Sequence, residues 1–509
     1  MAKLKYYNTN TGQWQEIYPS AISDGTNTFD VNRLQSIDDK IGILNKKVEN
    51  VVSVKEFGAK GDGVTDDTTA IQNAINSLSD GGMVYFPKGK YKLLNTLISL
   101  DNISFRGEQA VLQGDGTKTL VSAGNNNYFE GIQFENCTIA VNANSKKNVS
   151  FNRCKFITIY NVGTYYYGSY DSFITKCYFY DIKKDSINID NDGYNIEIIG
   201  NEFNNPSEFG GYGTEQTTAH VNVLSGHDIR VIGNKVFNNG GQGIIFSYNS
   251  TLQKGSYFCK AIGNHCEGNG HEGITSFGGT NKLTHSNVII GNTCRKNRYH
   301  QIEVWLSDRC IVQGNIVEES NTYGNIAAIT IYNSSHSVVS GNTVLDASNN
   351  GIAIVYGSTK VIVTNNSIKN TNGKNLGAGH QGHGILLDVN GGSSPTEISI
   401  LNNIIECTNG YTSNKSGVYS TSNTNKNNQI ENNRAFGYQY QVHLFAQQTC
   451  YNRATSIPTS GTWQSGDEVK NILPTEQGTA GSKYIVHGWK CVSGGTPGTW
   501  VEMRTFTGN

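Results

Sequence analysis

The sequence predicts an all-β protein whose main domain is a parallel β-helix, a solenoid of short stacked strands. Only 16% of its 509 residues are charged and 58 are glycine, which suits short strands and turns better than long helices. A turn motif built on asparagine recurs between about residues 100 and 450, at intervals of 23 to 37 residues. Each recurrence is followed by a short run of alternating apolar residues, so the repeat unit contains two or three strands.

The turn motif appears as IEIIGNEF, IRVIGNKVF and NVIIGNTC, with the asparagine between two short strands. The asparagines in this position are Asn201, Asn234, Asn264, Asn292, Asn315, Asn342, Asn366, Asn403 and Asn433. Upstream, Cys137, Cys154 and Cys177 fall at the same place, so we expect a cysteine column to pass into an asparagine column. Stacked asparagines can hydrogen-bond along the stack. A unit near 23 residues, with its extra length in loops, is typical of a parallel β-helix.

A further strand follows each turn and reads SINID, HVNVL, GITSF, QIEVW or AITIY. The residues expected to point into the core are Ile187, Val221, Ile244, Ile274, Ile302, Ile329 and Ile352. The alternate residues are expected to face solvent, on coils of the solenoid ~4.8 Å apart. One such outward column contains Asp190, Leu224, Ser247, Phe277, Trp305, Tyr332, Val355 and Asp388.

The N-terminal part has two regions ahead of the solenoid. Residues 1–30 are polar and aromatic. Residues 31–52 carry the spacing of a heptad seam in Leu34, Ile37, Ile41, Leu44, Val48 and Val51. The seam predicts a short coiled coil that holds chains in register, and a solitary amphipathic helix is the alternative.

The segment GAKGDGVTDDTTAIQNAI, residues 58–75, concentrates three aspartates between residues 62 and 67. Apolar side chains at helical spacing over residues 70–78 predict a helix directly after them. Carboxylates at a helix start cap free N–H groups and favour the positive end of the dipole. The spacing fits neither an EF-hand loop nor a phosphate loop. We therefore interpret the segment as a helix start capped by Thr65 or Asp66, and expect the helix to close the open end of the solenoid.

The tail changes in character at about residue 456. Three of the five tryptophans lie in residues 456–509, which predict a small separate β domain, so the solenoid is expected to span residues 53–455. The net charge of −1 indicates no nucleic-acid partner. Without a run of 18 apolar residues, no membrane insertion is expected.

The start of the chain and the cysteines predict the compartment. MAKLKYYNTNTGQWQ has no apolar core, so we expect no signal peptide. Ten scattered cysteines without a CxxC pair are expected to be buried free thiols of a protein that folds in a reducing cytoplasm.

Three segments resemble known families. VKEFGAKGDGVTDDTTAIQNAINSL, with GGMVYFPKGKYKL after it, resembles the N-terminal signature of the pectate-lyase-like superfamily of right-handed β-helices. The tail pattern from GTWQSGDEV through GWKCV to GTPGTW looks like the C-terminal module of many phage tailspike and appendage proteins. YYNTNTGQWQEI, ahead of the coiled coil, looks like a virion-attachment region over residues 1–30.

Together these motifs resemble a tailspike from a phage of Gram-positive bacteria. The resemblance implies a right-handed solenoid and a homotrimer in the virion tail, attached to other virion tail proteins through its N-terminus. It also implies that the protein binds and degrades a host cell-surface polysaccharide or teichoic acid.

Candidate substrate-binding and catalytic residues lie around the strands GITSF and QIEVW. Phe277, Trp305 and Tyr332, on adjacent coils, predict a flat apolar strip for sugar rings, with contact to a neighbouring chain of a trimer as the alternative. Beside this strip, Glu303 and Glu272 have Cα atoms expected ~11 Å apart, so their side chains can converge.

Glycoside hydrolysis needs two such carboxyl groups, so Glu272 and Glu303 are the first candidate catalytic pair. His271 precedes Glu272 and His300 aligns with it, and both histidines could tune the carboxyls or hold a phosphate. Lone surface carboxylates that are simply solvated are the alternative.

A second candidate is the acidic cluster of Asp185, Asp190 and Asp192. Its DSINID resembles the acidic strand of polygalacturonase-like hydrolases, which implies a catalytic role for Asp185 and Asp190. NGHEGITSFG resembles the Gly-His-Gly strand of that family and places His271 near its histidine. Lys184 stands where the resemblance expects a second aspartate.

A third candidate is HQGHGILLD with His380, His383 and Asp388, where loop polar residues are the alternative explanation. Tyr- and Gly-rich loops at 160–172 and 204–216 are expected to wall a groove, or to contact other chains of a trimer.

The expected function is hydrolysis of a host glycan, by a glycosidase or a teichoic acid phosphodiesterase. A non-catalytic receptor-binding or structural tail fibre and a polysaccharide lyase are the alternatives. No cofactor is assigned, and a divalent cation such as Ca²⁺ is considered only because lyases often use one.

Overall fold

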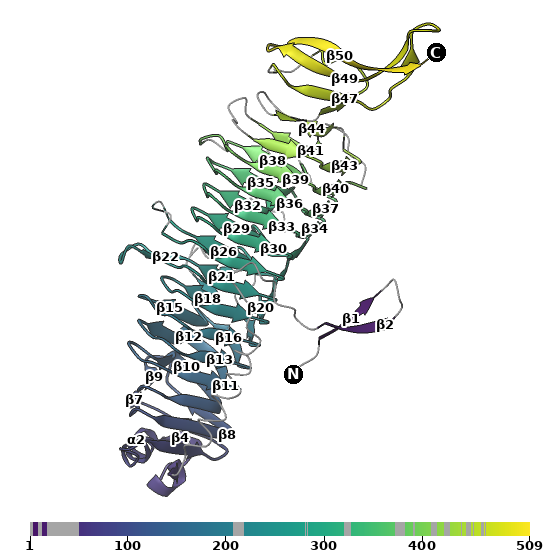
Figure 1. Ribbon diagram of the computed structural model, residues 1–509. Helices are drawn as coiled ribbons and strands as arrows, with labels where there is room; N and C mark the ends of the chain where they lie inside the picture. The colour runs from purple at the N-terminus through teal and green to yellow at the C-terminus, as the bar shows by residue number, and fades with distance from the viewer. Residues whose placement is uncertain are drawn as a thin grey trace. The chain divides into compact units, whose positions relative to one another are not determined.

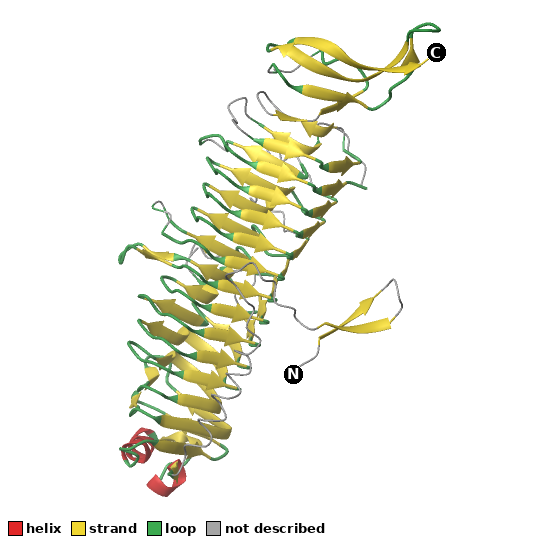
Figure 2. Cartoon of the chain, in the orientation of Figure 1, coloured by secondary structure: helices red, strands yellow, loops and turns green. Residues whose placement is uncertain are grey.

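The computed structural model describes two short strands near the N-terminus and most of the chain from residue 50 onward. The described residues are 4–8, 13–17 and 50–508, apart from 207–217, 280, 282, 320–326, 372–381, 390–391, 409–414, 422–427, 439, 444–448, 451, 460–462 and 464. The chain divides into two compact units, Met1–Glu49 and Asn50–Asn509. Strands dominate the described residues, as predicted (Figure 2).

In the first unit, β1 (Leu4–Asn8) and β2 (Gln13–Ile17) form an antiparallel hairpin. The coiled coil predicted for residues 31–52 falls almost wholly outside the described residues. For its last residues the prediction is wrong. Val51 and Val52 lie in β3 (Val51–Ser53), which pairs in parallel with β5 (Gly82–Phe86). These β-branched residues extend a sheet, where their backbone groups find partners, and so the solenoid begins before residue 53.

The predicted helix start is confirmed. The 3-10 helix η1 (Val54–Phe57) and β4 (Asp62–Asp66) lead into α2 (Thr68–Asn76), whose residues Ile71 and Ile75 are buried. Figure 1 shows α2 at one end of the strand stack. There the Gln72 side chain exchanges two hydrogen bonds of 2.9 Å with the backbone of Ile98 in β7 (Leu97–Ile98), as expected of a helix that closes the solenoid.

The aspartates of this segment bind backbone N–H groups. Asp66 Oδ1 accepts the Thr68 N–H at 3.0 Å and so caps the helix. The Asp67 carboxylate accepts the N–H groups of Lys60 and Gly61 at 2.5 and 2.8 Å. The acidic residues therefore fix the turn that enters α2, as the sequence indicates.

Each coil of the solenoid contributes one strand to each of three parallel sheets (Figure 1). The first sheet contains β11 (Ser150–Asn152), β13 (Phe173–Thr175), β16 (Glu197–Ile199), β19 (Arg230–Ile232), β24 (Lys260–Ile262), β27 (Val288–Ile290), β30 (Ile311–Gln313), β33 (Val338–Ser340), β36 (Ile362–Thr364), β39 (Ser399–Leu401), β42 (Gln429–Glu431) and β45 (Thr449–Cys450). The second contains β14 (Tyr178–Ile182), β17 (Glu202–Asn204), β20 (Lys235–Phe237), β25 (His265–Glu267), β28 (Thr293–Arg295), β31 (Ile316–Glu318), β34 (Thr343–Leu345), β37 (Ser367–Lys369), β40 (Ile404–Glu406) and β43 (Arg434–Phe436).

The third sheet carries the candidate site and is called the site sheet below. It contains β15 (Ile187–Asp190), β18 (Ala219–Val223), β21 (Gln242–Phe246), β26 (Ile274–Phe277), β29 (Ile302–Trp305), β32 (Ala327–Tyr332), β35 (Asn350–Val355), β38 (Ile385–Asp388), β41 (Ser416–Ser420) and β44 (Tyr440–His443). All neighbouring strands in it are parallel.

The first coils contain three longer strands, β8 (Ile103–Gln113), β10 (Tyr128–Asn142) and β12 (Lys155–Tyr167). The short strands β6 (Gly89–Lys92) and β9 (Thr119–Ser122) pair with β8 and β10. The loop predicted over residues 160–172 is therefore wrong in its first part, which belongs to β12. Tyr166 there is buried and donates its hydroxyl to the Val149 carbonyl at 2.9 Å, because tyrosine suits an inward strand position when its O–H has a partner.

The predicted asparagine column is confirmed. Each asparagine from Asn201 to Asn403 donates its side-chain N–H to the next asparagine's Oδ1 at 2.8 to 3.0 Å. The Cys177 N–H donates to Asn201 Oδ1 at 2.8 Å, so the cysteine column does pass into the asparagine column. The prediction that Cys137 belongs to this column is wrong. It pairs with Ile159 inside the continuous strand β10 and not at a turn.

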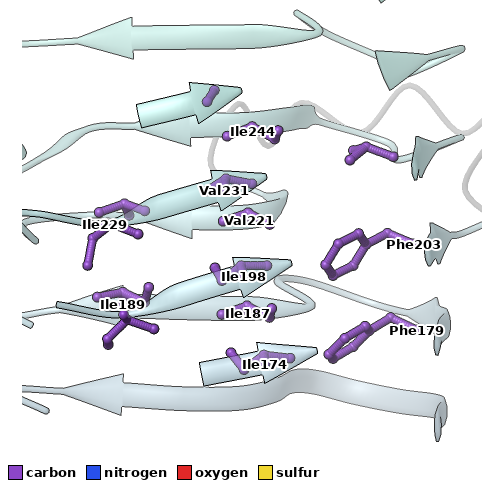
Figure 3. Close-up of a cluster of buried hydrophobic side chains, with 14 of the residues drawn as sticks. Ile174, Phe179, Ile187, Ile189, Ile198, Phe203, Val221, Ile229, Val231 and Ile244 are labelled. Carbon is purple, nitrogen blue, oxygen red and sulfur yellow. The ribbon is translucent and has the colours of Figure 1, made fainter. Parts of the chain in front are cut away.

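The core is a stack of aliphatic and aromatic side chains inside the three sheets. Figure 3 shows Ile187, Val221 and Ile244 of the site sheet above one another, with Phe179 and Phe203 stacked beside them. The two rings are 4.8 Å apart between centroids. The nine cysteines that the structure describes individually are free and buried, as predicted.

The C-terminal strands form a separate small sheet, as predicted. They are β46 (Asn452–Ala454), β47 (Glu468–Asn471), β48 (Glu476–Gln477), β49 (Lys483–Ser493) and β50 (Thr499–Gly508). Val469, Val486 and Trp489 form its core.

Candidate functional site

The candidate site lies on the outer face of the site sheet. Ile302 and Val304 of β29 belong to the core, so Glu303 and Trp305 point away from it. One outer column consists, on successive strands, of Asn188, Asn222, Ile245, Thr275, Glu303, Thr330, Ala353 and Leu386. We call it the outer column.

The prediction that the outer column faces solvent is wrong. Each of its side chains is at most 9% exposed. The His300 ring lies 3.5 Å from the Glu303 carboxyl, and Trp305 is the next residue of β29 on the same face. Polar groups in this column therefore sit in a medium that strengthens their mutual electrostatic interactions.

Glu303 faces the imidazole of His300. His300 Nε2 lies 3.5 Å from Glu303 Oε1. On the other side of the ring, Nδ1 lies 2.8 Å from the carbonyl oxygen of Ala327 and 2.9 Å from Thr330 Oγ1. A carbonyl oxygen only accepts, so the proton of neutral His300 is on Nδ1 and the Nε2 lone pair points toward Glu303.

Glu272 stands on the preceding coil and is paired with its neighbour. His271 Nδ1 lies 2.5 Å from Glu272 Oε2, and the His271 ring stacks on Tyr299 at 4.2 Å between centroids. Glu272 is 3% exposed, so its carboxylate is held almost out of water by one partner. The predicted alignment of Glu272 with His300 is confirmed, because the Gly273 N–H donates to the His300 carbonyl at 3.2 Å.

The charge states follow from burial. Desolvation raises the pKa of Glu303 well above its usual range, and the negative charge of Glu272 raises it further. Burial lowers the pKa of His300, and this outweighs the attraction of Glu272. Both directions disfavour an ion pair between Glu303 and His300 across this 3.5 Å contact.

A second amide ladder positions the segments that carry these groups. Asn269 donates its side-chain N–H to Asn297 Oδ1 at 2.8 Å, and Asn297 donates to Gln301 Oε1 at 2.7 Å. The ladder ends at Gln301, directly between His300 and Ile302. A Cβ on Gly273 would lie 2.7 Å from the Gln301 carbonyl oxygen, so only glycine allows the two coils to approach this closely.

The predicted aromatic strip is confirmed and is longer than expected. Phe277, Trp305 and Tyr332 are register partners, with ring centroids 5.5 and 5.0 Å apart. Tyr248 extends the strip beyond Phe277 at 5.6 Å, and Tyr356 extends it beyond Tyr332 at 4.7 Å. The Phe277 and Trp305 planes meet at 79°, so the strip is stepped, where we expected it to be flat.

Asp185 forms a separate buried cluster three coils before Glu272, a distance of ~14 Å along the stack. Its carboxylate accepts the Ala219 N–H at 2.8 Å and the side-chain N–H groups of Asn188 and Asn222 at 2.6 and 3.2 Å. Burial raises the pKa of Asp185 to about 6, while these three donors and Lys184 act to lower it.

Asp190 and Asp192 hold a hairpin at the edge of the sheet. The hairpin consists of β22 (Tyr248–Asn249) and β23 (Lys254–Gly255) and extends from the stack in Figure 1. Asp190 accepts the Asn249 side-chain N–H at 3.0 and 3.1 Å, and Lys254 pairs with Asp192. These contacts give Asp190 and Asp192 a structural role.

The third candidate does not form a comparable cluster. His380 lies outside the described residues. His383 is buried, accepts the Ser416 N–H at 3.1 Å and stacks on Tyr419 at 4.1 Å. Asp388 accepts the hydroxyl of Thr421.

The described residues hold no group of three or more His, Cys, Asp or Glu side chains that could bind a metal ion. Among the same residues, none of the helices is long and apolar enough to cross a membrane.

Sequence reasoning missed several neighbours of Glu303. Thr275, Thr330 and the two asparagines beside Asp185 lie in the same column as Glu303, and the repeat alignment already places them there. The signal that could have found them is the recurrence of polar residues at one position on several coils, next to positions that belong to the core. Tyr299 and Tyr356 lie outside the aligned strands and could not be placed from the repeats.

Comparisons with known proteins agree with this architecture. Residues 51–297, just under half of the chain, match a protein family described as rhamnogalacturonase A/epimerase, pectate lyase-like. The fold is that of a pectate lyase-like parallel β-helix. The matched range contains Asp185, His271 and Glu272 but ends before His300 and Glu303.

A solved structure with similar fold is that of the pre-mature gene product 12 of bacteriophage phi29. It is 16% identical, with a TM-score of 0.58, over 84% of this chain and 62% of that one.

Curated relatives match only short segments. A probable glucan endo-1,3-β-glucosidase of Arthroderma benhamiae is 42% identical over 64 residues, 13% of this chain and 7% of that protein. Alginate lyase 7 of Azotobacter vinelandii is 58% identical over 43 residues, 8% of this chain and 5% of that protein. The chain thus spans a small part of the curated relatives that it matches.

Proposed function

We propose that this protein binds a host cell-surface glycan along the outer face of the site sheet and hydrolyses it with Glu303 and Glu272. One observation supports this most. Two carboxyl groups on adjacent coils, one kept protonated by burial and the other paired with His271, act on each other electrostatically. Hydrolysis of a glycosidic bond needs one acid and one ionised carboxylate in a single site.

In this proposal Glu303 is the general acid. Its raised pKa keeps the proton available at neutral pH for the leaving-group oxygen. Glu272 is the carboxylate that activates water or attacks the sugar, and the contact of 2.5 Å between its Oε2 and His271 Nδ1 holds it in place. His300 orients the Glu303 carboxyl through Nε2, because Ala327 fixes the tautomer of the ring.

The substrate is a polymer long enough to reach the aromatic strip. Half-exposed rings from Tyr248 to Tyr356 offer apolar contact for sugar rings beside Glu303. An exopolysaccharide or a wall teichoic acid meets this need, and the same acid serves a glycosidic or a phosphodiester bond. The fold shared with a phage protein supports a place in a virion tail, where we propose a homotrimer.

A binding-only tail fibre is the second candidate, and the length of the aromatic strip favours it. In that case the strip would bind the polymer, and the two glutamates would leave it intact. A polysaccharide lyase is the third candidate.

The test is mass spectrometry of products after incubation of the full-length protein with teichoic acid and with exopolysaccharide from candidate hosts. Oligomers with a new reducing sugar mean glycoside hydrolysis, and a phosphomonoester means phosphodiester cleavage. An unsaturated uronate would replace the hydrolase by a lyase. Intact polymer from a host that the protein binds would contradict both enzymes and favour the binding-only fibre.

Glu303→Gln and Glu272→Gln keep the shape of the site and should each abolish turnover while adhesion remains. Glu431→Gln is the matched control, because Glu431 is only partly buried and lies in the first sheet, away from the site sheet. Normal turnover in both site variants would transfer the proposal to Asp185.

A further inference from the structure

Three buried oxygen atoms in the outer column have no hydrogen-bond partner among the described residues. They are Asn188 Oδ1, Asn222 Oδ1 and Thr275 Oγ1. All three side chains are at least nine-tenths buried. Buried polar atoms are nearly always paired, so three orphans in one column indicate that a ligand supplies the missing partners.

The two asparagine oxygens are fixed as acceptors. Both amide nitrogens donate to Asp185, at 2.6 and 3.2 Å, and a carboxylate only accepts. The amides therefore cannot turn over without losing these bonds, and their oxygens point away from Asp185. Asn188 and Asn222 are register partners, so the oxygens repeat at the coil spacing of ~4.8 Å.

Between the asparagines and Thr275 the outer column carries Ile245, which is 8% exposed. The next residue after Thr275 is Glu303. The column thus presents two acceptors, one apolar side chain and one hydroxyl on consecutive coils, and then the proposed general acid. A sugar chain has the same alternation of hydroxyl groups and apolar C–H faces.

The charges around this part of the column are negative. The carboxylates of Asp185 and Asp190 flank the asparagines. Of the nearby cations, Lys254 is paired with Asp192, and Lys184 offsets part of the charge of Asp185. An anionic residue would meet carboxylates and lone pairs, which repel it. A hydroxyl group supplies the proton that each orphan oxygen lacks.

We propose that Asn188, Asn222 and Thr275 bind an uncharged, hydroxyl-rich segment of the glycan, with Ile245 against the apolar face of one sugar. This site deepens the proposed function and rests on it for the position of the cleaved bond at Glu303. It favours a polymer with neutral sugars over one that is charged at every residue.

The first experiment measures binding in Glu303→Gln, so that turnover does not consume the ligand. The probe is an array of defined bacterial oligosaccharides in a neutral and an acidic set, with poly(glycerol phosphate) as a further anionic polymer. We expect binding within the neutral set. Preferential binding of the acidic set or of poly(glycerol phosphate), or no binding at all, would overturn the proposal.

The second experiment adds Asn222→Asp or Thr275→Val to Glu303→Gln and measures Kd by calorimetry for the neutral oligosaccharide found. Thr275→Val removes a hydroxyl and should raise Kd about tenfold, the effect of losing one hydrogen bond to a buried group. Asn222→Asp keeps an acceptor oxygen but loses the N–H that fixes the side chain on Asp185, so it should also raise Kd. Asn365→Asp and Thr343→Val are matched controls, at an exposed position and in the second sheet. Thr275→Val keeps the side-chain shape, so its Kd still tests the site if Asn222→Asp fails to fold.

The two proposals fail separately. Unchanged Kd in Thr275→Val and Asn222→Asp, with turnover in the parent, would overturn this site and leave the hydrolase. Raised Kd in both, with intact polymer in the parent, would support this site and overturn the hydrolase.

Discussion

Asp185 and Glu303 are two buried carboxyl groups on the same face of the same sheet, and they differ in their partners. Asp185 accepts three hydrogen bonds from neutral N–H donors, which stabilise its ionised form against burial. For Glu303 burial is the main cause of the raised pKa, the charge of Glu272 raises it further, and the His300 imidazole lies 3.5 Å away. Burial alone does not mark an acid catalyst. The charge and hydrogen-bonding character of the neighbours decide whether a buried carboxyl holds a proton or accepts bonds.

The largest expected effect separates the two groups directly. Glu303→Gln should lower kcat by about 10² to 10⁴, the usual contribution of a general acid. Asp185→Asn should leave kcat within about tenfold, because Asp185 holds the side chains of Asn188 and Asn222 and has no part in the proposed chemistry. Steady-state kinetics on the same polymer measures both. Equal loss of kcat in the two variants would show that the distinction between them is wrong.

Removing Glu272 should change the charge state of Glu303. Glu272→Gln abolishes the repulsion that raises the pKa of Glu303, so Glu303 should titrate at lower pH. The carboxyl band in infrared spectra that disappears in Glu303→Gln identifies the group. An unchanged titration would mean that the two glutamates do not act on each other.

The aromatic strip should affect binding more than chemistry. Trp305→Ala removes a ring with neighbours on both sides and should raise KM about tenfold, with kcat nearly unchanged. Phe436→Ala is the control, since Phe436 is exposed in the second sheet. A similar rise in KM in both variants would indicate a general effect on the fold.

The last prediction concerns stability. The pKa of Asp185 is raised from 3.8 to about 6, so its favourable contribution is fully present below pH 3.8 and is lost as pH rises through 6. A shift of this size corresponds to about 3 kcal/mol. The stability of the parent relative to Asp185→Asn should fall by up to that amount between pH 3.5 and 7.5, measured by urea denaturation. A constant difference would show that Asp185 does not titrate in this range.

Much of the fold could be predicted from the sequence, because each coil repeats the same local requirements. The asparagine at the turn after the first sheet bonds to the next asparagine, so its spacing identifies the coils. The Cys137 error shows the limit. A residue can match the motif while its strand runs on without a turn, since the continuity of β10 depends on pairing with β8 and β12.

The site could be predicted only in part. Periodicity placed Glu303, Glu272 and the aromatic residues on adjacent coils, because side chains alternate strictly along a strand. It could not predict that the outer column is buried, since burial depends on side chains of other columns. The unpaired oxygens of Asn188 and Asn222 could not be predicted either, because they depend on which way each amide turns toward Asp185.

The most direct test of the central claim is hydrolysis in ¹⁸O-labelled water, with mass spectrometry of the oligomers released from the polymer. If Glu303 acts as a general acid in hydrolysis, the parent should incorporate one ¹⁸O per cleaved bond, at one of the two new ends. Glu303→Gln should release almost none, and Asp185→Asn should release labelled oligomers. Unlabelled unsaturated products, or labelled products from Glu303→Gln at the parent's rate, would contradict it.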